Sequence, residues 1–370
     1  MRLTLIGPAF PWRGGIPLLT TELAHRLAAE GHRVRVRTWT SQGPARLLPA
    51  QRHPLDTPEA RPFPTVDEPL SWRDPLGWVR TGRRAGAESD LVVVVFYTTV
   101  QAPALAVIAR LARRRARVVV ICANAVPHEP RPGDRSLLSW LVRGADAAVA
   151  HTPAEREALC RLTTRPVAVA PLPPHLPDTD RPDVRPDRPA ARRLLFFGKV
   201  RPYKGVDVLL EALRDVPDVT LSIVGEFYSD VARTRALVER LGLADRVELH
   251  PDYLPADRIP ALFAGFDALV LPYRNATASQ LVALAHWNGL PTVATRVGNF
   301  PETVRDGVDG LLCAPGDPAD LARALRTLYE PGRLERLRSG VRPAATEGVW
   351  QRYTETLFRL AARPPHEAAH

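Results

Sequence analysis

Short apolar runs alternate with amphipathic segments along most of this chain. Runs such as 3–6, 91–96 and 117–121 are rich in apolar and β-branched residues, which is typical of parallel strands buried on both faces. Other segments, such as 102–113, repeat apolar residues at helical spacing. Because strands and helices alternate, the pattern predicts an α/β fold with parallel sheets.

The individual elements follow from the same pattern. Strands are predicted at 3–6, 34–36, 91–96, 117–121, 147–150, 167–170, 194–197, 220–224, 246–250, 268–271, 292–295 and 310–313. Helices are predicted at 18–28, 102–113, 134–143, from 153, at 206–213, 230–241, from 257, and at 280–287, 318–329 and 350–361.

Two stretches lack any apolar period. Residues 41–75 are rich in Pro, Arg and Asp and are interpreted as a long surface excursion. Residues 171–192 contain seven prolines among Asp and Arg, which indicates a stiff linker between domains. A chain of 370 residues favours two domains. The predicted organisation is an N-terminal domain at 1–171, a linker at 172–192, a C-terminal domain at 193–347, and at 348–370 a helix that packs back on the N-terminal domain, followed by a tail.

The charge balance indicates the class of partner. The net charge is +10 and the isoelectric point is about 10.2, which favours polyanions, phosphorylated substrates or an acidic membrane surface. Nucleic acid is the weaker interpretation, because the clusters at 83–84 and 113–115 lack interleaved aromatic residues. These arginines are interpreted as solvated helix ends, and no nucleic-acid partner is expected.

Cysteine usage and hydropathy bear on the compartment. Cys122, Cys160 and Cys313 are far apart, form no CxxC pair, and two of them lie in apolar context, which indicates free buried thiols in a reducing compartment. The apolar run at the N-terminus is too short for a signal peptide. The longest apolar segment, 91–100, is half of a membrane span. The expectation is a cytoplasmic protein, at most peripheral to a membrane.

A basic loop at 198–205 is the strongest candidate site. It follows the strand at 194–197 and precedes a helix, with Gly198 permitting a sharp turn. Lys199 and Lys204 are the chain's two lysines among 50 basic residues, and Arg201 lies between them. A strand, a basic loop and a helix start suit a phosphate, which meets free amides, the helix dipole and the cations. The alternative interpretation is a solvated loop.

The first loop of the chain contains Gly14 and Gly15 but lacks the GxGxxG dinucleotide pattern. A tight entry into the following helix explains the two glycines as well as a ligand does.

Several short strings in this order resemble a known family. They are Pro-Trp-Arg-Gly-Gly-Ile at 11–16, Asn-Ala-Val-Pro-His-Glu at 124–129, Phe-Phe-Gly-Lys-Val-Arg-Pro-Tyr-Lys-Gly at 196–205, Gly-Glu-Phe-Tyr at 225–228, Leu-Pro-Tyr-Arg at 271–274, and Gly-Leu-Pro-Thr-Val-Ala-Thr-Arg-Val-Gly-Asn-Phe-Pro-Glu at 289–302. Together they resemble the group 1 retaining glycosyltransferases of GT-B fold over nearly the whole chain. The resemblance implies two facing Rossmann-like domains and a C-terminal helix that returns to the first domain.

The resemblance also implies roles for individual residues. Arg201 and Lys204 match the cations that hold the diphosphate of a nucleotide sugar and stabilise it as it departs, without a metal or a separate cofactor. Residues implied to bind the donor are Gly198, Lys199, Glu226, Phe227, Tyr253, Leu254, Ala276, Thr277, Ala278, Ser279 and Glu302. Residues implied on the acceptor side are Gly14, Gly15, Tyr97, His128 and Glu129.

Three positions depart from the family pattern. Many members have two glutamates where this chain has Ala276 and Leu284, and a histidine where it has Ala123. The missing glutamates remove the usual anchors for hydroxyls of the donor. His128 and Glu129 are the nearest polar groups to Ala123, and either a functional pair or a capped turn explains them.

Other candidate motifs give weaker evidence of function. The sequence Asp-Thr-Asp at 178–180 lies in the linker rather than after a buried strand, so no metal site is expected there. His286 and Trp287 lie on a helix with apolar neighbours and are interpreted as packing groups.

The predicted function is therefore a metal-independent transferase that moves a sugar, with retention of configuration, from a nucleotide-diphosphate sugar to a small-molecule, glycan or lipid-linked acceptor. The alternative is a protein of GT-B fold that has lost turnover and acts by binding. A basic nucleic-acid-binding α/β protein is a third, weaker interpretation.

Overall fold

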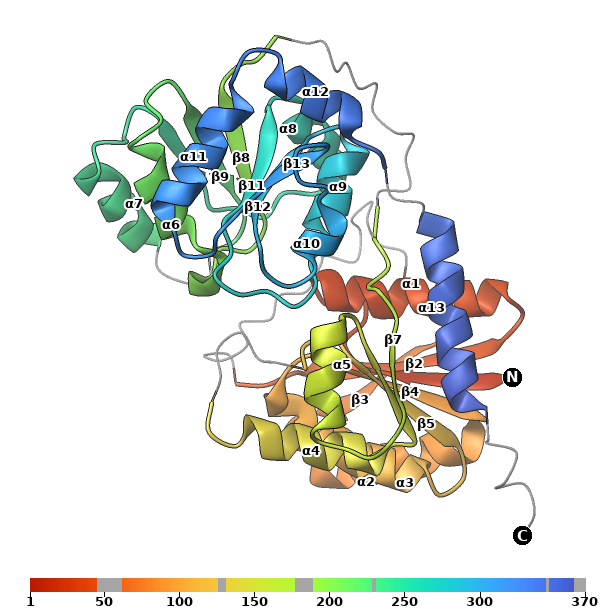
Figure 1. Cartoon of the computed structure of the whole chain (residues 1–370). Helices are drawn as coiled ribbons and strands as arrows, with labels where there is room; N and C mark the ends of the chain where they lie inside the picture. The colour runs from red at the N-terminus through yellow and green to blue at the C-terminus, as the bar shows by residue number, and fades with distance from the viewer. Residues whose placement is uncertain (45–61, 126–130, 177–188, 228–230, 344–345, 363–370) are drawn as a thin grey trace. The chain divides into compact units, whose positions relative to one another are not determined.

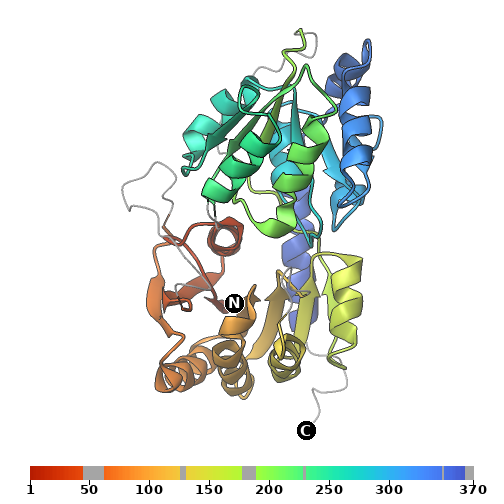
Figure 2. The same cartoon turned by 90° about the vertical axis from the view of Figure 1, so that its left-hand side faces the viewer.

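A computed structural model describes residues 1–44, 62–125, 131–176, 189–227, 231–343 and 346–362. The chain divides into two compact units (Figures 1 and 2). Unit 1 comprises Met1–His175 and Thr346–His370, and unit 2 comprises Leu176–Ala345. Each unit is built around one parallel β-sheet that is covered by helices on both faces.

Unit 1 contains a seven-stranded parallel sheet with strand order β3-β2-β1-β4-β5-β6-β7. Its strands are β1 (Arg2–Ile6), β2 (Arg33–Ser41), β3 (Val66–Ser71), β4 (Leu91–Phe96), β5 (Arg117–Cys122), β6 (Ala147–Ala150) and β7 (Val167–Val169). Its helices are α1 (Gly15–Ala29), α2 (Pro75–Glu88), the 3₁₀ turn η1 (Thr99–Gln101), α3 (Ala102–Ala112), α4 (Asp134–Gly144), α5 (Pro153–Cys160) and α13 (Thr346–Ala361).

The core of unit 1 has two layers, one on each face of the sheet. One layer joins α3, α4 and Leu159 of α5 to the sheet, and the other joins α1 and α13 to it. The whole of β4 is buried, as its unbroken apolar sequence requires of a central strand. The C-terminal helix α13 belongs to this unit because Trp350, Tyr353 and Leu357 are buried in the second layer.

Unit 2 contains a six-stranded parallel sheet with strand order β10-β9-β8-β11-β12-β13. Its strands are β8 (Arg193–Phe197), β9 (Thr220–Val224), β10 (Val247–His250), β11 (Ala268–Leu271), β12 (Thr292–Thr295) and β13 (Gly310–Cys313). Its helical segments are η2 (Pro202–Lys204), α6 (Val206–Leu213), α7 (Val231–Arg240), η3 (Ala256–Arg258), α8 (Ile259–Ala264), α9 (Leu281–Trp287), α10 (Phe300–Thr303), α11 (Pro318–Leu328) and α12 (Arg333–Gly340).

The predicted fold class is confirmed. The chain forms two Rossmann-like α/β units with parallel sheets, and its last helix packs on the first sheet. Thr152 caps the N-terminus of α5, since its hydroxyl accepts a hydrogen bond from the amide of Glu155. Most of the predicted linker, at 177–188, lies outside the described residues.

The prediction that 41–75 is a surface excursion was wrong at its C-terminal end, where β3 pairs with β2 at the edge of the sheet. An edge strand is paired on one side only, so it tolerates Pro69 and the acidic pair Asp67 and Glu68, which obscured the strand period. Helices α2, α10 and α12 were also not predicted.

Two further expectations concern the compartment. Cys122 and Cys313 are buried free thiols, whereas Cys160 is exposed. Among the described residues, no helix combines the length and the apolar character that crossing a membrane requires.

Candidate functional site

The candidate residues of unit 2 gather where its sheet changes direction. After β8 the chain builds β9 and β10 on one side, and then crosses to build β11, β12 and β13 on the other. The loops that follow β8 and β11 are therefore neighbours at the carboxyl edge of the sheet, which is where open α/β sheets bind ligands. The basic loop at 198–205 and the loop at 272–279 are these two loops.

Two glycines bring the backbone close together at this edge. Gly198 and Gly225 follow the paired strands β8 and β9 and have φ values of 99° and 137°, which favour glycine. A Cβ on Gly225 would lie 2.4 Å from the carbonyl oxygen of Gly198. A Cβ on Gly198 would lie 3.6 Å from Nζ of Lys204. The lysine amine is thus held close to the end of β8.

Lys204 is a buried cation. Its side chain is 8% exposed, and its Nζ lies 5.0 Å from the ring centroid of Tyr273. Burial, with the charges of Lys199 and Arg201 in addition, lowers the pKa of Lys204 to about 7. No carboxylate among the described residues forms an ion pair with it. A buried amine surrounded by cations favours an anionic ligand, because the anion supplies the missing counter-charge.

The loop after β11 holds the turn that carries Lys204. Gly205 has φ of 67°, and a Cβ there would lie 2.0 Å from the carbonyl oxygen of Pro272. The amide of Arg274 donates to the carbonyl oxygen of Tyr203 at 2.7 Å. The guanidinium of Arg274 forms two hydrogen bonds with the carboxylate of Asp207, at 2.6 and 2.7 Å. These contacts tie η2 and the first turn of α6 to the neighbouring loop.

The Arg274–Asp207 pair also perturbs both groups. Burial alone would raise the pKa of Asp207, but the hydrogen bonds and charge of Arg274 outweigh it and lower that pKa. The hydrogen bonds that Arg274 donates to Asp207 raise the pKa of Arg274. Both groups stay charged at neutral pH, so they neutralise each other and leave Lys204 unbalanced.

Asn299 holds the loop at 276–279. Its side-chain oxygen accepts from the amide of Ser279 at 3.0 Å, and its side-chain nitrogen donates to the carbonyl oxygen of Ser279 at 3.3 Å. Its own amide donates to the carbonyl oxygen of Thr277 at 3.0 Å. Gly298 makes this approach possible, since a Cβ there would lie 2.5 Å from that same oxygen. The loop is thereby fixed at the start of α9.

The remaining donor-side candidates follow the adjacent strands. Glu226 and Phe227 follow β9, and Phe227 forms an isolated parallel bridge with Val200. Tyr253 and Leu254 follow β10 and are partly buried. Glu302 lies exposed on α10 after β12, while Ala276, Ala278 and Ser279 are partly buried and Thr277 is buried. The sheet therefore brings the donor-side candidates to one edge, where Lys199 and Arg201 are near enough to Lys204 for their charges to lower its pKa.

Sequence reasoning assigned no role to several residues that shape this edge. Tyr273, Arg274 and Asn299 occur in the quoted family strings, and Asp207 lies in the first turn of α6. A glycine followed by asparagine just before a helix is a signal for such an anchor. The Arg274–Asp207 pair, whose members are 67 positions apart in sequence, had no such signal.

The acceptor-side candidates of unit 1 also lie at the switch point of their sheet. Gly14 and Gly15 follow β1, and Tyr97 follows its neighbour β4. Gly14 has φ of 125°, and a Cβ on Gly15 would meet nothing within 4 Å, so a ligand can approach the backbone there. The hydroxyl of Tyr97 donates to the side-chain oxygen of Gln42. His128 and Glu129 lie outside the described residues.

The positions that depart from the family pattern differ in location. Leu284 is 8% exposed and packs in the core of unit 2, and Ala276 is partly buried against the same core. Ala123 is buried after β5. His286 is also buried, and burial lowers its pKa, as its interpretation as a packing group implies.

Residues 178–180 lie outside the described part of the chain. Among the residues that the structure describes, no group of three or more His, Cys, Asp or Glu side chains is placed to hold a metal ion.

Comparison with protein families matches both halves of the chain. Residues 14–175 match the glycosyl transferase 4-like domain, and residues 191–331 match the glycosyl transferases group 1 family.

Curated relatives are similar at moderate identity. A D-inositol 3-phosphate glycosyltransferase of Geodermatophilus obscurus is 32% identical over 271 residues, which cover 67% of this chain and 59% of that protein. The corresponding protein of Xylanimonas cellulosilytica is 31% identical over 245 residues, covering 60% of this chain and 58% of that protein. The chain therefore spans less than two thirds of the length of these relatives.

Solved structures share the fold over almost the whole chain. HepE of Anabaena, solved in complex with UDP and glucose, has a TM-score of 0.74 at 20% identity and covers 96% of this chain and 99% of its own. Sucrose-phosphate synthase of Thermosynechococcus elongatus has a TM-score of 0.71 at 19% identity, with coverage of 97% and 98%. At these identities the likeness concerns the fold alone.

Proposed function

Since this chain belongs to the group 1 glycosyltransferases of GT-B fold, we propose that it transfers a glycosyl group from a nucleotide-diphosphate sugar to an acceptor. The observation that carries the proposal is the buried, unbalanced Lys204 beside Lys199 and Arg201 at the switch point of unit 2. A nucleoside diphosphate offers the counter-charge that Lys204 lacks among the described residues.

The chemistry follows from where charge develops. When the bond between the sugar and the diphosphate breaks, the diphosphate oxygens gain negative charge. In this proposal Arg201 and Lys204 stabilise that charge. Because the turn that carries Lys204 is already held by the Arg274–Asp207 pair and by the close approach at Gly205, little reorganisation of this lysine is needed during the reaction.

Two finer features belong to the same proposal. The transfer retains the configuration of the sugar, as the family resemblance implies. It also proceeds without a metal ion or a separate cofactor, because Lys199, Arg201 and Lys204 carry the charge compensation that a divalent metal supplies in other transferases.

The test is turnover. Nucleotide sugars are screened by thermal shift, since a ligand that binds the folded protein stabilises it, and each hit is incubated with a panel of acceptors. The panel contains small molecules, glycans and lipid-linked sugars, with D-inositol 3-phosphate first because it is named for the relatives. We expect release of free nucleoside diphosphate and the same yield in EDTA. Activity that EDTA abolishes and Mg²⁺ or Mn²⁺ restores would overturn metal independence.

A second candidate function is binding without turnover, which the departures at Ala123, Ala276 and Leu284 favour. The same assay separates it from catalysis. A nucleotide sugar that stabilises the protein, but from which no acceptor or water releases diphosphate, supports the binding function. Loss of activity in Lys204→Ala, measured with an active donor, supports the transferase.

The donor sugar follows from the same departures. Ala276 stands at the surface of the loop before α9 without a carboxylate for sugar hydroxyls, whereas Leu284 is part of the core and lines nothing. We infer that the donor presents fewer or differently placed hydroxyls, as in deoxy or amino sugars. Competition between deoxy-sugar nucleotides and UDP-glucose or GDP-mannose tests this, and equal or better use of the fully hydroxylated donors rejects it.

A further inference from the structure

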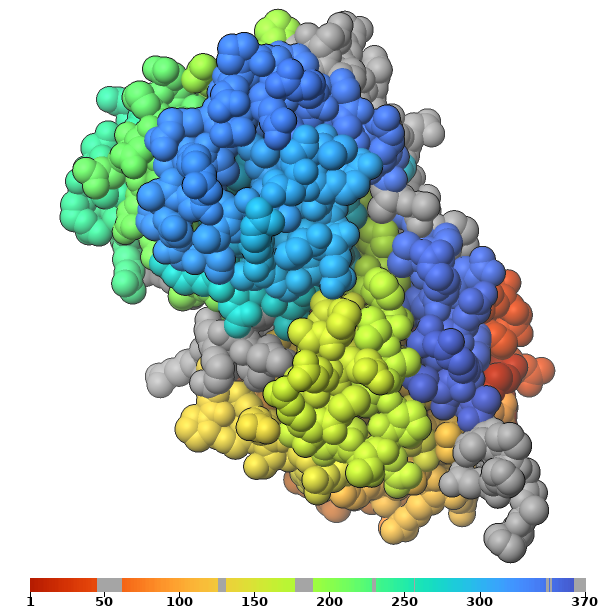
Figure 3. All heavy atoms as spheres, in the orientation of Figure 1, coloured from red at the N-terminus to blue at the C-terminus, as the bar shows by residue number. Residues whose placement is uncertain are grey.

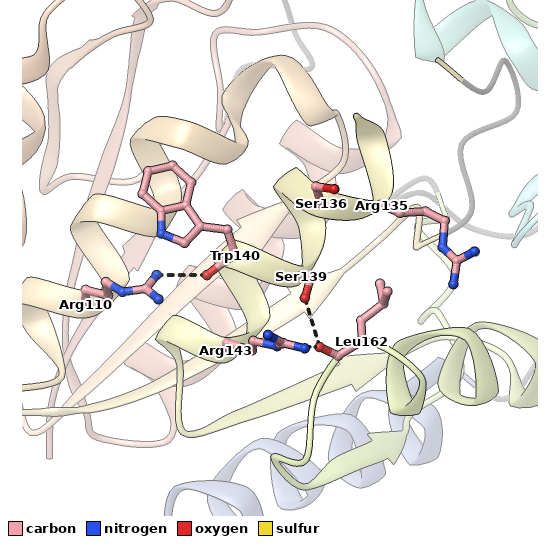
Figure 4. Close-up of a pocket in the computed structure, with 7 residues that line it drawn as sticks. All are labelled: Arg110, Arg135, Ser136, Ser139, Trp140, Arg143 and Leu162. Carbon is pink, nitrogen blue, oxygen red and sulfur yellow. Dashed lines mark hydrogen bonds between the residues drawn. The ribbon is translucent and has the colours of Figure 1, made fainter. Parts of the chain in front are cut away.

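Unit 1 has a groove whose lining residues are distant in sequence from every candidate residue of unit 2. The groove has a volume of about 450 Å³ and lies between α3, α4 and the turn that follows α5 (Figure 4). Three arginines line it, Arg110 from α3 and Arg135 and Arg143 from α4, together with Trp140 and Leu162. Among the described residues, no acidic side chain lines it.

Helical periodicity explains why these side chains share one face of α4. Residues 135, 139 and 143 are spaced by four, as are 136 and 140, so they form one stripe. On the opposite face Leu138, Leu141 and Val142 are buried in the core. The stripe is exposed, and Figure 3 shows atoms of α4 and α5 at the surface of unit 1. It presents arginine, serine and tryptophan, and no carboxylate.

The three guanidinium groups keep their charge available. Arg110 donates to the carbonyl oxygen of Trp140 at 2.9 Å, and Nε of Arg143 donates to the carbonyl oxygen of Leu162 at 3.0 Å, as Figure 4 shows. These acceptors are neutral. Arg135 has no hydrogen bond or ion pair within the described residues. The contacts therefore fix two of the guanidinium groups in place without neutralising them.

The nearby carboxylates are engaged elsewhere. Asp134, the only acidic residue of α4, is buried and accepts hydrogen bonds from Thr99 and from the amide of Arg131. Asp146 forms ion pairs with Arg113 and Arg117, neither of which lines the groove. The positive charge of the groove is thus left without a counter-charge from the described protein.

Trp140 adds an apolar component. It is one of the few large hydrophobic side chains exposed in the described chain, at 38%, and its ring centroid lies 5.7 Å from the guanidinium carbon of Arg110. Tryptophan with an exposed ring beside cations is typical of side chains that sit at the level of lipid headgroups. A soluble phosphate needs no such ring, and the groove is open rather than enclosed.

We propose that this groove docks unit 1 on an anionic phospholipid surface, with lipid phosphates between the three arginines and the Trp140 ring in the headgroup layer. The net charge of +10 favours the same encounter at longer range. The proposal concerns a face of unit 1 and does not depend on the proposed transfer reaction.

The test is sedimentation of the full chain with vesicles in the absence of any nucleotide sugar. We expect binding to mixed phosphatidylcholine–phosphatidylglycerol vesicles, weakened by salt, and none to phosphatidylcholine alone. Arg135→Gln with Arg143→Gln lowers the partition constant roughly 30-fold, given the usual contribution of each cation near an anionic surface. Trp140→Ala lowers it several-fold with an unchanged salt dependence.

Matched variants separate this site from general charge. Arg233→Gln with Arg240→Gln on α7 removes the same charge from exposed positions of unit 2, and we expect it to bind vesicles like the wild type. Arg135→Lys with Arg143→Lys keeps the charge and should retain binding. Thermal melting shows that each variant is folded.

Three results would overturn the proposal. The first is equal binding to neutral and anionic vesicles. The second is an equal loss in the two Arg→Gln pairs. The third is binding of inorganic phosphate or single-stranded DNA that requires Arg135 and Arg143 while anionic vesicles stay unbound.

Discussion

Both units place candidate residues at the switch point of a parallel sheet, but they build that edge from different chemistry. In unit 2 the edge holds a buried lysine, two further cations and an ion pair that braces them. In unit 1 the described edge carries glycines and a neutral network, in which Tyr97 and Gln101 both donate to the side-chain oxygen of Gln42. The fold is repeated while the electrostatics are not.

The two edges differ in how they affect the stability of the unliganded protein. Burying Lys204 without a counter-ion costs free energy in the unliganded protein, because the charged form is desolvated. The neutral network of unit 1 buries no charge, although the side-chain oxygen of Gln101 is buried without a hydrogen-bond partner among the described residues. An unfavourable buried charge is thus a mark of the phosphate side, and neutral hydrogen-bonding groups suit a hydroxyl-bearing partner.

The largest effect on this difference between the units is expected from Lys204→Met, which removes the charge of the side chain and keeps most of its volume. We expect the affinity for the cognate nucleoside diphosphate, measured by calorimetric titration, to fall by about 2 to 4 kcal/mol. The melting temperature of the unliganded protein should rise, because the desolvated amine is gone. Unchanged affinity would mean that the lysine is a packing residue and the phosphate assignment is wrong.

Gly205→Ala tests the close approach that positions the lysine. The new Cβ would meet the carbonyl oxygen of Pro272, and the backbone has φ of 67°. Gly316→Ala is the control, since Gly316 has φ of 71° but nothing within 4 Å. We expect the control to lose about 1 kcal/mol of unfolding free energy and Gly205→Ala about 2 kcal/mol more, in chemical denaturation. Equal losses would show that η2 can move away from the neighbouring loop.

The pH dependence sharpens the same contrast. Below pH 7 the folded and unfolded chains both protonate Lys204, whereas between pH 7 and the ordinary lysine pKa the unfolded chain binds more protons. The unfolding free energy contributed by this residue therefore rises with pH above 7. Diphosphate affinity should move the other way, falling by up to about tenfold per pH unit because the ligand needs the protonated amine.

Titrations of wild type and Lys204→Met at pH 6, 7, 8 and 9 isolate this residue, since other titrating groups are common to both. A wild-type affinity that parallels that of the variant at every pH would contradict the expectation.

The smallest expected effect concerns the ion pair between Arg274 and Asp207. Arg274 and Asp207 have exposed side-chain fractions of 42% and 48%, so their coupling energy in a double-mutant cycle of Arg274→Ala and Asp207→Asn should be about 0.2 to 1 kcal/mol in stability. We expect a comparable loss in diphosphate affinity, since the pair positions the Lys204 turn rather than touching the ligand. A coupling larger than the loss in Lys204→Met would make the pair itself part of the anion site.

Much of the fold was predictable from local pattern. The central strands β4, β5, β8 and β11 and the helices between them are written in apolar runs and helical periods, because buried parallel strands must be apolar on both faces. The basic loop was also visible, since Lys199 and Lys204 stand out in a chain that otherwise uses arginine.

The edge strand β3 and the contacts that hold the candidate site were not predictable from local pattern. The strand β3 is stabilised by pairing with β2, and its own residues carry a weak period. Likewise, the sequence alone did not show that Leu284 belongs to the core rather than to the ligand edge, because that depends on how α9 is rotated against the sheet.

The sequence by itself determined the α/β rhythm, the candidate cations and the family strings. Only the tertiary structure decided which groups share an environment. Lys204 is buried because Gly198, Tyr273 and the loop after β11 surround it, and Arg110 meets Trp140 because α3 packs against α4. The burial of a side chain and the charges around it depend on contacts between residues that are distant in the chain. The local sequence pattern does not reveal such contacts.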